Sequence, residues 1–399
     1  MKDRRIILGV TGGIAAYKAA ELVRLLIKAE ARVRVAMTRN AARFITPLTF
    51  EALSGHRVIQ DMFEEEGTSI PHIRWGQASD LVVIAPATAN FIAKMAGGIA
   101  DDFLSTLAVA ATARILVCPA MNTHMYQNAA VQHNIRVLEE RGVAVMKPGE
   151  GFLACRSEGP GRLPDPADIV EQIRVLLAHR DYSGLRVLVT AGPTVEPLDP
   201  VRFISNRSSG KMGYAVARAA MRRGASVTLV SGPTSLRPPP GVRVVDVRTA
   251  EDMRRAVLDA GPESDVVIKA AAVSDYRPRE RAAKKIKKGP ETLSLELVKN
   301  PDILAELGQA RGERPRVLVG FAAETDDLLA HATEKLKAKN LDMIVANDVS
   351  RDDAGFESDT NAVRVIHRDG RVEDCPLMSK EAVADFLLDR IRAVLRGKD

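Results

Sequence analysis

The chain has 399 residues, enough for about two or three domains. Its composition, 46% hydrophobic and 27% charged, is that of a globular protein with sizeable cores, which excludes an intrinsically disordered chain. The net charge of +6 comes from 57 basic and 51 acidic residues that are mostly interspersed, so it is weak evidence for a nucleic-acid partner and suits an anionic small molecule equally well.

The cysteine content and the apolar runs of the sequence indicate the cellular compartment in which the protein is expected. Cys118, Cys155 and Cys375 are too few, and odd in number, to form a disulfide framework, so a reducing cytoplasm is expected. No uncharged apolar stretch approaches the roughly 18 residues that a membrane helix needs, and we expect no membrane association. The first apolar run is short and leads into a charged amphipathic helix, unlike a signal peptide.

The first half of the chain alternates between predicted strands and helices. Residues 5–10 predict a buried strand that runs into the Gly12-Gly13 turn. Further strands are predicted at 32–37, at 79–85 and at 115–118, the last because it is a short apolar run. The side chains that predict a helix after the first turn, by their spacing on one face, are Ala19, Leu22, Val23 and Leu26.

The second half repeats this opening. Residues 185–191 predict a strand that ends in a glycine, and residues 212–223 predict a helix that ends before Gly224. Strands follow at 226–230 and at 264–268, the latter after an acidic start like that of the third strand of the first half. Strands that alternate with helices indicate a parallel sheet covered on both faces.

The chain is therefore expected to be an α/β protein with two doubly wound, Rossmann-like domains and mainly parallel sheets. We place the domains at 1–180 and 181–399, joined near 180–184. In this fold class, ligands bind outside the carboxyl ends of the strands. Asn122 and His124 follow the apolar run at 115–118, so we expect both at the functional edge of the first sheet.

Neither half has the features of a standard dinucleotide site. The first turn reads Gly-Gly-Ile-Ala-Ala rather than G-x-G-x-x-G, and no acid for a ribose stands near the end of the second strand. The residues there, 38–40 in one half and 231–232 in the other, suit a phosphate better. Residues 209–212, SGKM, lack the upstream glycine and the Ser or Thr of a P-loop.

Longer motifs resemble known enzyme families. Those of the first half resemble the flavin-dependent cysteine decarboxylases; they are VTGGIAAYKAAELVR, FITPLTFEALSG, APATANFIAKMAGGIADD and PAMNTHMY. Those of the second half resemble the phosphopantothenate–cysteine ligases; they are TAGPTVEPLDPVRFISNRSSGKMG, AAAVSDYRP, KKIKK, KNPDIL, GFAAET and ANDV. Together, and in this order, they resemble the bifunctional enzymes of coenzyme A biosynthesis over nearly the whole chain.

The first resemblance implies a flavodoxin-like domain that decarboxylates phosphopantothenoylcysteine with FMN. The flavin would oxidise the substrate thiol to a thioaldehyde, which lets CO2 leave, and would then return the hydride. The FMN positions so implied are Gly12, Gly13, Ile14, Thr38, Thr88, Asn90, Ser105 and Thr106. Taken alone, the glycine pair indicates only a tight strand–helix turn.

The same resemblance assigns catalytic roles. His72 matches the active-site base, although a lone histidine is more often structural, and its flanking PHIRWG departs from the family pattern. Asn122 matches the residue that binds the substrate carboxylate, and Met125 matches a substrate contact. Cys155 matches the proton donor of the last step; a solvated loop thiol is the alternative. Cys118 indicates a small buried apolar residue.

The second resemblance implies a CTP-dependent ligation through an acyl-cytidylate, with Mg2+ on the triphosphate. Asn206 would hold the intermediate, Arg202 the phosphopantothenate anion and Lys285 the charged transition state. The remaining implied nucleotide positions are Ala271, Asp275, Pro301, Asp302, Ile303, Leu304, Phe321, Lys335 and Lys339. Without the resemblance, KKIKK would indicate a solvated charge run or a weak nucleic-acid patch. No residue is assigned as a metal ligand.

Other interpretations remain at this point. An NAD(P)-dependent reductase on a tandem Rossmann-like fold is the enzymatic alternative, although the ribose acid is missing. A basic nucleic-acid-binding protein would require a steep dependence of affinity on salt. We expect small-molecule partners, namely 4′-phosphopantothenate, cysteine and CTP, without nucleic acid or membrane. The resemblance also implies a homo-oligomer with trimers of the flavin domain built into a larger dodecamer.

Overall fold

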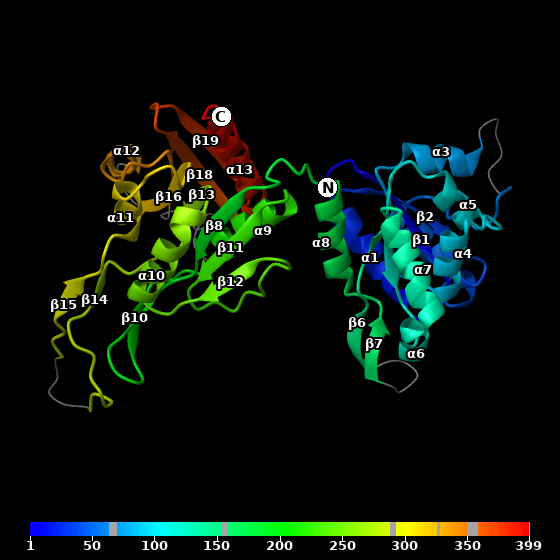
Figure 1. The fold of residues 1–399 in the computed structure, drawn as a ribbon, viewed down its shortest axis with the longest axis horizontal. Helices are drawn as coiled ribbons and strands as arrows, with labels where there is room; N and C mark the ends of the chain where they lie inside the picture. Colours follow the sequence, from blue (N-terminus) through cyan, green and yellow to red (C-terminus); the bar gives the residue numbers. More distant parts are fainter. Residues whose placement is uncertain (64–69, 153–157, 288–292, 325–327, 349–357, 399) are drawn as a thin grey trace. The chain divides into compact units, whose positions relative to one another are not determined.

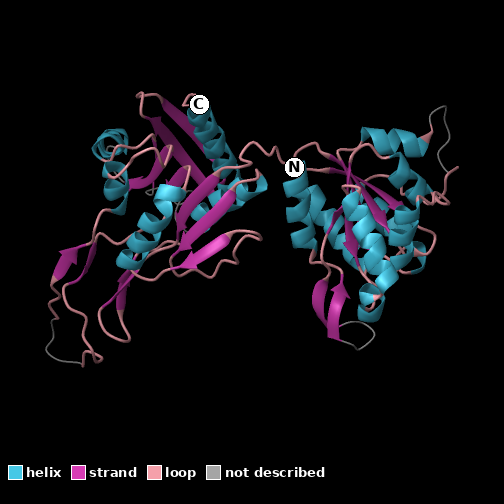
Figure 2. Ribbon diagram, viewed as in Figure 1, coloured by secondary structure: helices cyan, strands magenta, loops and turns pink. Residues whose placement is uncertain are grey.

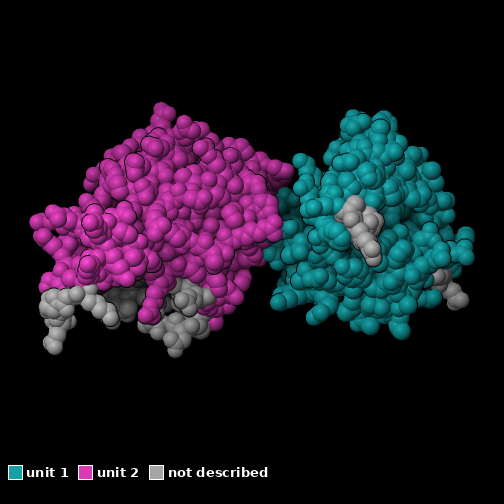
Figure 3. Space-filling view, turned by 90° about the horizontal axis from the view of Figure 1, so that it is seen from below, with its two compact units in different colours: residues 1–178 teal, residues 179–399 magenta. Residues whose placement is uncertain are grey.

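The computed structural model describes residues 1–63, 70–152, 158–287, 293–324, 328–348 and 358–398. The chain divides into two compact units, residues 1–178 and 179–399, which are coloured separately in Figure 3. Each unit has a mainly parallel sheet with helices on both faces (Figure 2), so the predicted fold class is confirmed. No helix in the described ranges combines the length and the apolar character that crossing a membrane requires.

The first unit contains a five-stranded parallel sheet in the order β2-β1-β3-β4-β5. Its strands are β1 (Arg5–Val10), β2 (Arg32–Met37), β3 (Leu81–Ala87), β4 (Arg114–Pro119) and β5 (Ala144–Val145). Its helices are α1 (Ala16–Lys28), η1 (Ala41–Arg43), α2 (Pro47–Ser54), α3 (Pro71–Ala78), α4 (Ala89–Gly97), α5 (Phe103–Ala110), α6 (Thr123–Gln127), α7 (Ala129–Glu140) and α8 (Pro166–Leu177). A separate hairpin pairs β6 (Gly149–Phe152) with β7 (Glu158–Arg162).

The apolar pattern of the sequence explains these layers. Every residue of β3 is buried, because helices cover both faces of the central strands. The buried positions of α1 include Ala19, Leu22, Val23 and Leu26, as the helical spacing predicts. One core lies between the sheet and α1, α2 and α8, and the other lies between the sheet and α3, α4, α5 and α7 (Figure 1).

The second unit contains an eight-stranded sheet in the order β12-β11-β8-β13-β16-β17-β18-β19. The first six strands are parallel to one another. β18 is antiparallel to β17, and β19 is antiparallel to β18. The strands are β8 (Arg186–Ala191), β11 (Ser226–Ser231), β12 (Arg243–Asp246), β13 (Val266–Lys269), β16 (Val317–Glu324), β17 (Met343–Asp348), β18 (Thr360–His367) and β19 (Val372–Ser379). Two small ribbons pair β9 (Val195–Pro197) with β10 (Phe203–Ser205) and β14 (Tyr276–Pro278) with β15 (Leu297–Lys299).

Helices cover both faces of this sheet. On one face lie α9 (Lys211–Arg222) and α13 (Lys380–Arg396), and on the other lie α10 (Ala250–Ala260), α11 (Ile303–Gln309) and α12 (Leu328–Ala338), with η2 (Gly261–Glu263) after α10. The helix predicted at 212–223 is α9, shifted by one residue. Gly224 follows it with a φ of +93°, a left-handed conformation that glycine adopts without strain.

Candidate active sites

The first candidate site lies at the carboxyl edge of the sheet of the first unit. Because β2 and β3 flank β1 on opposite sides, the strand order reverses between β1 and β3, and ligands of doubly wound sheets bind at such a point. The turn from Gly12 to Ile14 follows β1, Thr38 follows β2, and Thr88 follows β3. The structure thus brings the predicted FMN positions of three separate motifs to one edge.

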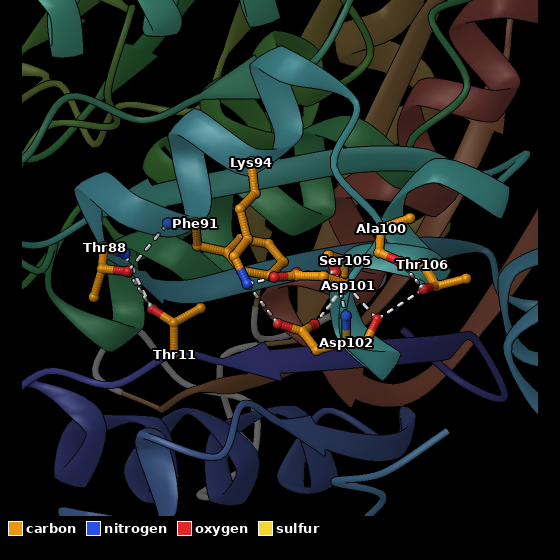
Figure 4. A network of polar contacts seen from close by, with 9 residues as sticks. All are labelled: Thr11, Thr88, Phe91, Lys94, Ala100, Asp101, Asp102, Ser105 and Thr106. Carbon is orange, nitrogen blue, oxygen red and sulfur yellow. Dashed lines mark hydrogen bonds and ion pairs between the residues drawn. The ribbon is translucent and has the colours of Figure 1, made fainter. Parts of the chain in front are cut away.

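Hydrogen bonds of two threonines connect the chain segments at this edge. The Thr11 hydroxyl donates to the Pro86 carbonyl oxygen at 2.7 Å and accepts from the backbone N–H of Thr88 at 3.0 Å. The Thr88 hydroxyl in turn accepts from the backbone N–H of Phe91 and caps α4, as Figure 4 shows. Thr11 was not among the predicted residues, and its position directly after the first strand was the available signal.

The glycine turn has the shape needed to hold a bound group. A Cβ at Gly12 would lie 2.6 Å from the Cβ of Asn40, so only glycine fits there. A Cβ at Gly13 would meet only a methyl group of Thr88, at 3.7 Å, and the side chain of Ile14 is 61% exposed. The turn therefore leaves open space at the edge, which fits the phosphate and ring of a flavin nucleotide.

The hydroxyls of Ser105 and Thr106 form hydrogen bonds within the first turn of their own helix. Ser105 is buried and forms a capping box with Asp102 at the start of α5, and the Thr106 hydroxyl donates to the Asp102 carbonyl oxygen at 2.8 Å. Lys94 approaches Asp101 at 2.6 Å and Asp102 at 3.1 Å in the same cluster (Figure 4). Both hydroxyls thus stabilise the beginning of α5, and their contact with FMN stays a prediction, as does that of the exposed Asn90 on α4.

The loop after β4 carries Asn122. Its side-chain oxygen accepts from the backbone N–H of His124 at 2.8 Å and caps α6, which fixes the direction of the amide. Met125, one turn along, is 49% exposed. The sequence prediction that this segment carries its polar side chains just beyond the carboxyl end of β4 agrees with the structure.

The β6–β7 hairpin docks onto the Asn122 loop. The backbone N–H of Met121 donates to the Gly161 carbonyl oxygen at 2.9 Å, and a Cβ at Gly161, whose φ is +145°, would overlap the Met121 carbonyl oxygen. The close approach therefore requires glycine. Cys155 lies between the two strands of this hairpin, in a segment outside the described residues.

We expect Gly161→Ala to lower decarboxylation by roughly a hundredfold, because the hairpin must move away from the Asn122 loop. Ligation should be unaffected, and release of CO2 from phosphopantothenoylcysteine is the measurement. Gly149→Ala is the matched control, since a Cβ there meets its nearest atom, in Arg162, only at 3.7 Å. Equal activities of the two variants would show that hairpin docking does not matter.

His72 stands at the start of α3, which packs against α5. Its Nδ1 atom is buried and has no hydrogen-bond partner among the described residues. The same helix carries the buried Trp75, which lies edge-to-face on Phe103 at 5.7 Å and under the guanidinium of Arg34. These contacts of Trp75 hold α3 in place, and the role of His72 as a base stays a prediction.

Cys118 is fully buried in β4, and its sulfur lies 3.8 Å from that of Met146. Burial strongly raises the pKa of its thiol. We expect Cys118→Ser to cost about 1–3 kcal/mol of unfolding free energy, because it buries a hydroxyl, with the flavin retained. Denaturant unfolding followed by flavin absorbance measures this. Accumulation of an oxidised product in this variant would instead make Cys118 the proton donor.

The second candidate site is a cleft of about 870 Å³ at the carboxyl edge of the sheet of the second unit. Its lining brings together predicted residues from five separate stretches of sequence. These residues are Asn206, Ala271, Asp275, Pro301, Asp302, Ile303, Leu304, Phe321, Lys335 and Lys339. One wall comes from α9 and α13 and the other from α11 and α12, so the cleft lies across the sheet edge.

Fixed contacts position the cleft residues. The Asn206 amide donates to the Ala272 carbonyl oxygen at 3.1 Å. Asp302 caps α11 and pairs with Lys339 at 2.8 Å. Burial raises the pKa of Asp302, but the hydrogen bonds from Lys339 and from the backbone N–H of Ala305, together with the charges of Lys339 and Lys269, outweigh burial, so the pKa is lowered overall.

Arg202 and Lys285 do not line this cleft. The Arg202 guanidinium binds the buried Asp199 at 2.7 Å and the Ile286 carbonyl oxygen at 2.7 Å. The backbone N–H of Ile286 also donates to Asp199, at 3.0 Å, and Lys285 next to it is exposed. Arg202 therefore anchors the segment that carries Lys285.

Two buried lysines of the cleft were missed by the sequence prediction. Lys269 ends β13 and Lys380 begins α13, and burial lowers the pKa of each to about 8. The Lys380 ammonium donates to the Ser358 carbonyl oxygen at 2.6 Å. A lysine that ends the apolar run VVIK was a signal for Lys269; the sequence around Lys380 offers none.

Comparison with known proteins assigns both units. Residues 1–178 match the family described as Flavoprotein, and residues 182–395 match the DNA/pantothenate metabolism flavoprotein C-terminal domain. The chain is 48% identical over 399 residues to the coenzyme A biosynthesis bifunctional protein CoaBC of Bacillus subtilis (strain 168), covering 99% of this chain and 98% of that one. It is 49% identical over 399 residues to the protein of the same name from Escherichia coli (strain K12), covering 98% and 97%.

A solved structure of the C-terminal domain of a coenzyme A biosynthesis bifunctional protein CoaBC is similar to 55% of this chain and 99% of its own, with 44% identity and a TM-score of 0.47. The full-length relatives match both units in the same order, and none of these matches supports the alternative of an NAD(P)-dependent reductase. The chain belongs to the family of coenzyme A biosynthesis bifunctional proteins.

Proposed function

We propose that the chain makes 4′-phosphopantetheine from 4′-phosphopantothenate and cysteine in two steps. The second unit forms the amide with CTP, and the first unit decarboxylates the product with FMN. The proposal rests on the cleft of the second unit. Five separate stretches of the sequence resemble those of the ligases, and residues from all five line this cleft.

The cleft suits a carboxylate that is activated by a nucleotide. Asn206 and the start of α9 lie on one wall. The N-cap of α9 is Gly210, which has no side chain to cap the helix, so the first N–H groups of α9 favour an anion; Lys211 beside them is paired with Asp359 at 2.7 Å. We place phosphopantothenate there, with Asn206 holding the acyl-cytidylate. The nucleotide would occupy the opposite wall with Lys335 and Lys339. We place Mg2+ on the triphosphate oxygens, which suit it as ligands.

The first unit supplies a site for FMN, formed by the Gly12–Ile14 turn, Thr38 and the Thr88 end of β3. When bound, FMN would supply the reversible two-electron oxidation that makes the substrate carboxylate a leaving group. The chain's own residues would bind and move protons. Asn122 would orient the carboxylate, His72 would accept a proton, and Cys155 would return one to the product.

The surroundings of the enzyme are also part of the proposal. The buried thiols of Cys118 and Cys375 are free, which suits a reducing cytoplasm. Several large apolar side chains of the first unit are exposed, and we propose that they are covered in a homo-oligomer built from trimers, as large as a dodecamer; they include Ile14, Tyr17, Phe44 and Leu48. The partners would be small molecules.

Incubation of the purified protein with 4′-phosphopantothenate, cysteine, CTP and Mg2+, followed by mass analysis, tests the proposal. We expect phosphopantothenoylcysteine and then 4′-phosphopantetheine with loss of CO2, and a visible flavin absorbance. Omission of CTP should stop both products, whereas supplied phosphopantothenoylcysteine should still lose CO2. A protein without flavin absorbance or CTP-dependent product would refute the assignment of the corresponding unit.

A further inference from the structure

Lys269 lies at the floor of the cleft of the second unit without a polar partner. It follows three fully buried residues of β13, and it is itself only 9% exposed while it lines the cleft. Within the described ranges, no hydrogen bond or ion pair reaches its ammonium group. A buried charge without a partner is costly, so a ligand that brings a negative charge would compensate this cost.

The neighbouring charges leave this site positive. Lys269 shares its face of β13 with Val267, which packs in the core beneath α11 and α12. From these helices Asp302 and Lys339 act on its charge, and Lys335 stands one turn before Lys339. Asp302 is already paired with Lys339 at 2.8 Å, and among the described residues no other carboxylate acts on the charge of Lys269.

The position of Lys269 indicates which part of a nucleotide it meets. Asn206, Lys211 and Lys380 approach from the wall formed by α9 and α13, where we place the acid substrate. Lys269 faces the opposite wall, formed by α11 and α12. A nucleoside triphosphate whose α-phosphate meets the substrate carboxylate near Asn206 would then extend its outer phosphates toward Lys269.

We propose that Lys269 binds the β- and γ-phosphates of the nucleoside triphosphate, and so the pyrophosphate that leaves. This inference rests on the proposed ligase function. In that step the carboxylate oxygen forms a bond to the α-phosphorus, the bond from the α-phosphorus to the bridging oxygen breaks, and its electron pair stays with pyrophosphate. Lys269 would neutralise the charge that develops on this leaving group.

Binding at Lys269 has a signature in proton uptake. Burial lowers the pKa of Lys269 to about 8, Asp302 acts against this shift, and Lys339 adds to it. A phosphate beside the ammonium favours the charged form and raises the pKa again. Binding above pH 8 therefore takes up a proton, so affinity stays constant below pH 8 and weakens as the pH rises further.

Lys380 also has its pKa lowered to about 8, and it faces the cleft together with Lys211 and Lys335. The pH dependence of the wild-type protein thus has two sources. The difference between the wild-type protein and a Lys269 variant isolates the contribution of Lys269. Lys269→Met suits this purpose, because methionine keeps the length of the side chain and belongs in a buried apolar site.

The experiment is titration calorimetry of the full-length protein with MgCTP, magnesium pyrophosphate and CMP, at pH 7 and pH 8.5 and in two buffers of different ionisation enthalpy. In Lys269→Met we expect MgCTP and pyrophosphate to bind about ten- to a hundredfold more weakly at pH 7, and CMP to bind unchanged. Part of the proton uptake that accompanies binding to the wild-type protein at pH 8.5 should be absent from Lys269→Met. Lys337→Met, which removes an exposed charge of α12 outside the cleft, should bind all three as the wild-type protein does.

Three outcomes would overturn the assignment. Wild-type affinity and proton uptake in Lys269→Met would show that no phosphate contacts Lys269. Equal weakening of CMP would place the contact on the α-phosphate or the nucleoside. If the wild-type protein binds neither MgCTP nor pyrophosphate, the proposed ligase function itself is wrong, and the Lys269 assignment falls with it.

Discussion

Asn122→Asp is expected to abolish decarboxylation while the protein stays folded, binds flavin and ligates. The aspartate still accepts the backbone N–H of His124, and Asp caps a helix as well as Asn, so the loop keeps its shape. It loses the amide donor and places a negative charge against the substrate carboxylate. Loss of one such donor costs about two to three decades in rate, and repulsion adds to it.

The matched control for this variant is Asn128→Asp. Asn128 caps the next helix, α7, by accepting from the backbone N–H of Ala130 at 2.9 Å, so the same chemical change is made at the same kind of position. CO2 release from phosphopantothenoylcysteine, with flavin content from absorbance, compares the two. If Asn122→Asp decarboxylates as fast as Asn128→Asp, Asn122 does not bind the carboxylate.

Much of the fold could be predicted because its signals are local. The apolar runs at 5–10 and 32–37 are strands with those same bounds, since each run ends where the chain turns at a sheet edge. The helix after the first turn buries the predicted face. The antiparallel strands β18 and β19 were not predicted, although they form a local hairpin in which Ile366 pairs with Val372. The Asp369-Gly370 turn between them was the available signal.

For the site residues, too, a local motif indicates the position in the fold, whereas the contacts made there do not follow from the motif. Residues of motifs such as PAMN and KNPDIL lie at a sheet edge, because a motif that follows a strand reaches the edge with it. A motif does not show which side-chain hydroxyl already forms a hydrogen bond with the backbone. Ser105 is such a case, since its hydroxyl is used in the cap of α5. It also cannot show that Lys269, far from α12 in sequence, shares a cleft with Lys339.

Lys285 shows how the structure sharpens a motif-based prediction. Arg202 anchors the segment that carries Lys285, but its own charge is neutralised by Asp199 through two hydrogen bonds of 3.0 and 2.7 Å. Lys285 is exposed, and no ion pair to it occurs in the described part of the chain. Of these two cations, Lys285 is therefore the one whose charge is available to a developing phosphoryl group.

Lys285→Gln should therefore lower acyl-cytidylate formation by about two to three decades, the worth of a few kcal/mol of transition-state stabilisation. Glutamine keeps most of the length and a hydrogen-bond donor but removes the charge. CTP-dependent pyrophosphate release without cysteine is the measurement, and decarboxylation of supplied phosphopantothenoylcysteine should be normal because the first unit is a separate compact unit. Lys284→Gln removes the adjacent exposed charge and should release pyrophosphate normally. The same rate in both variants would mean that KKIKK is a solvated charge run and that the ligation site lies elsewhere.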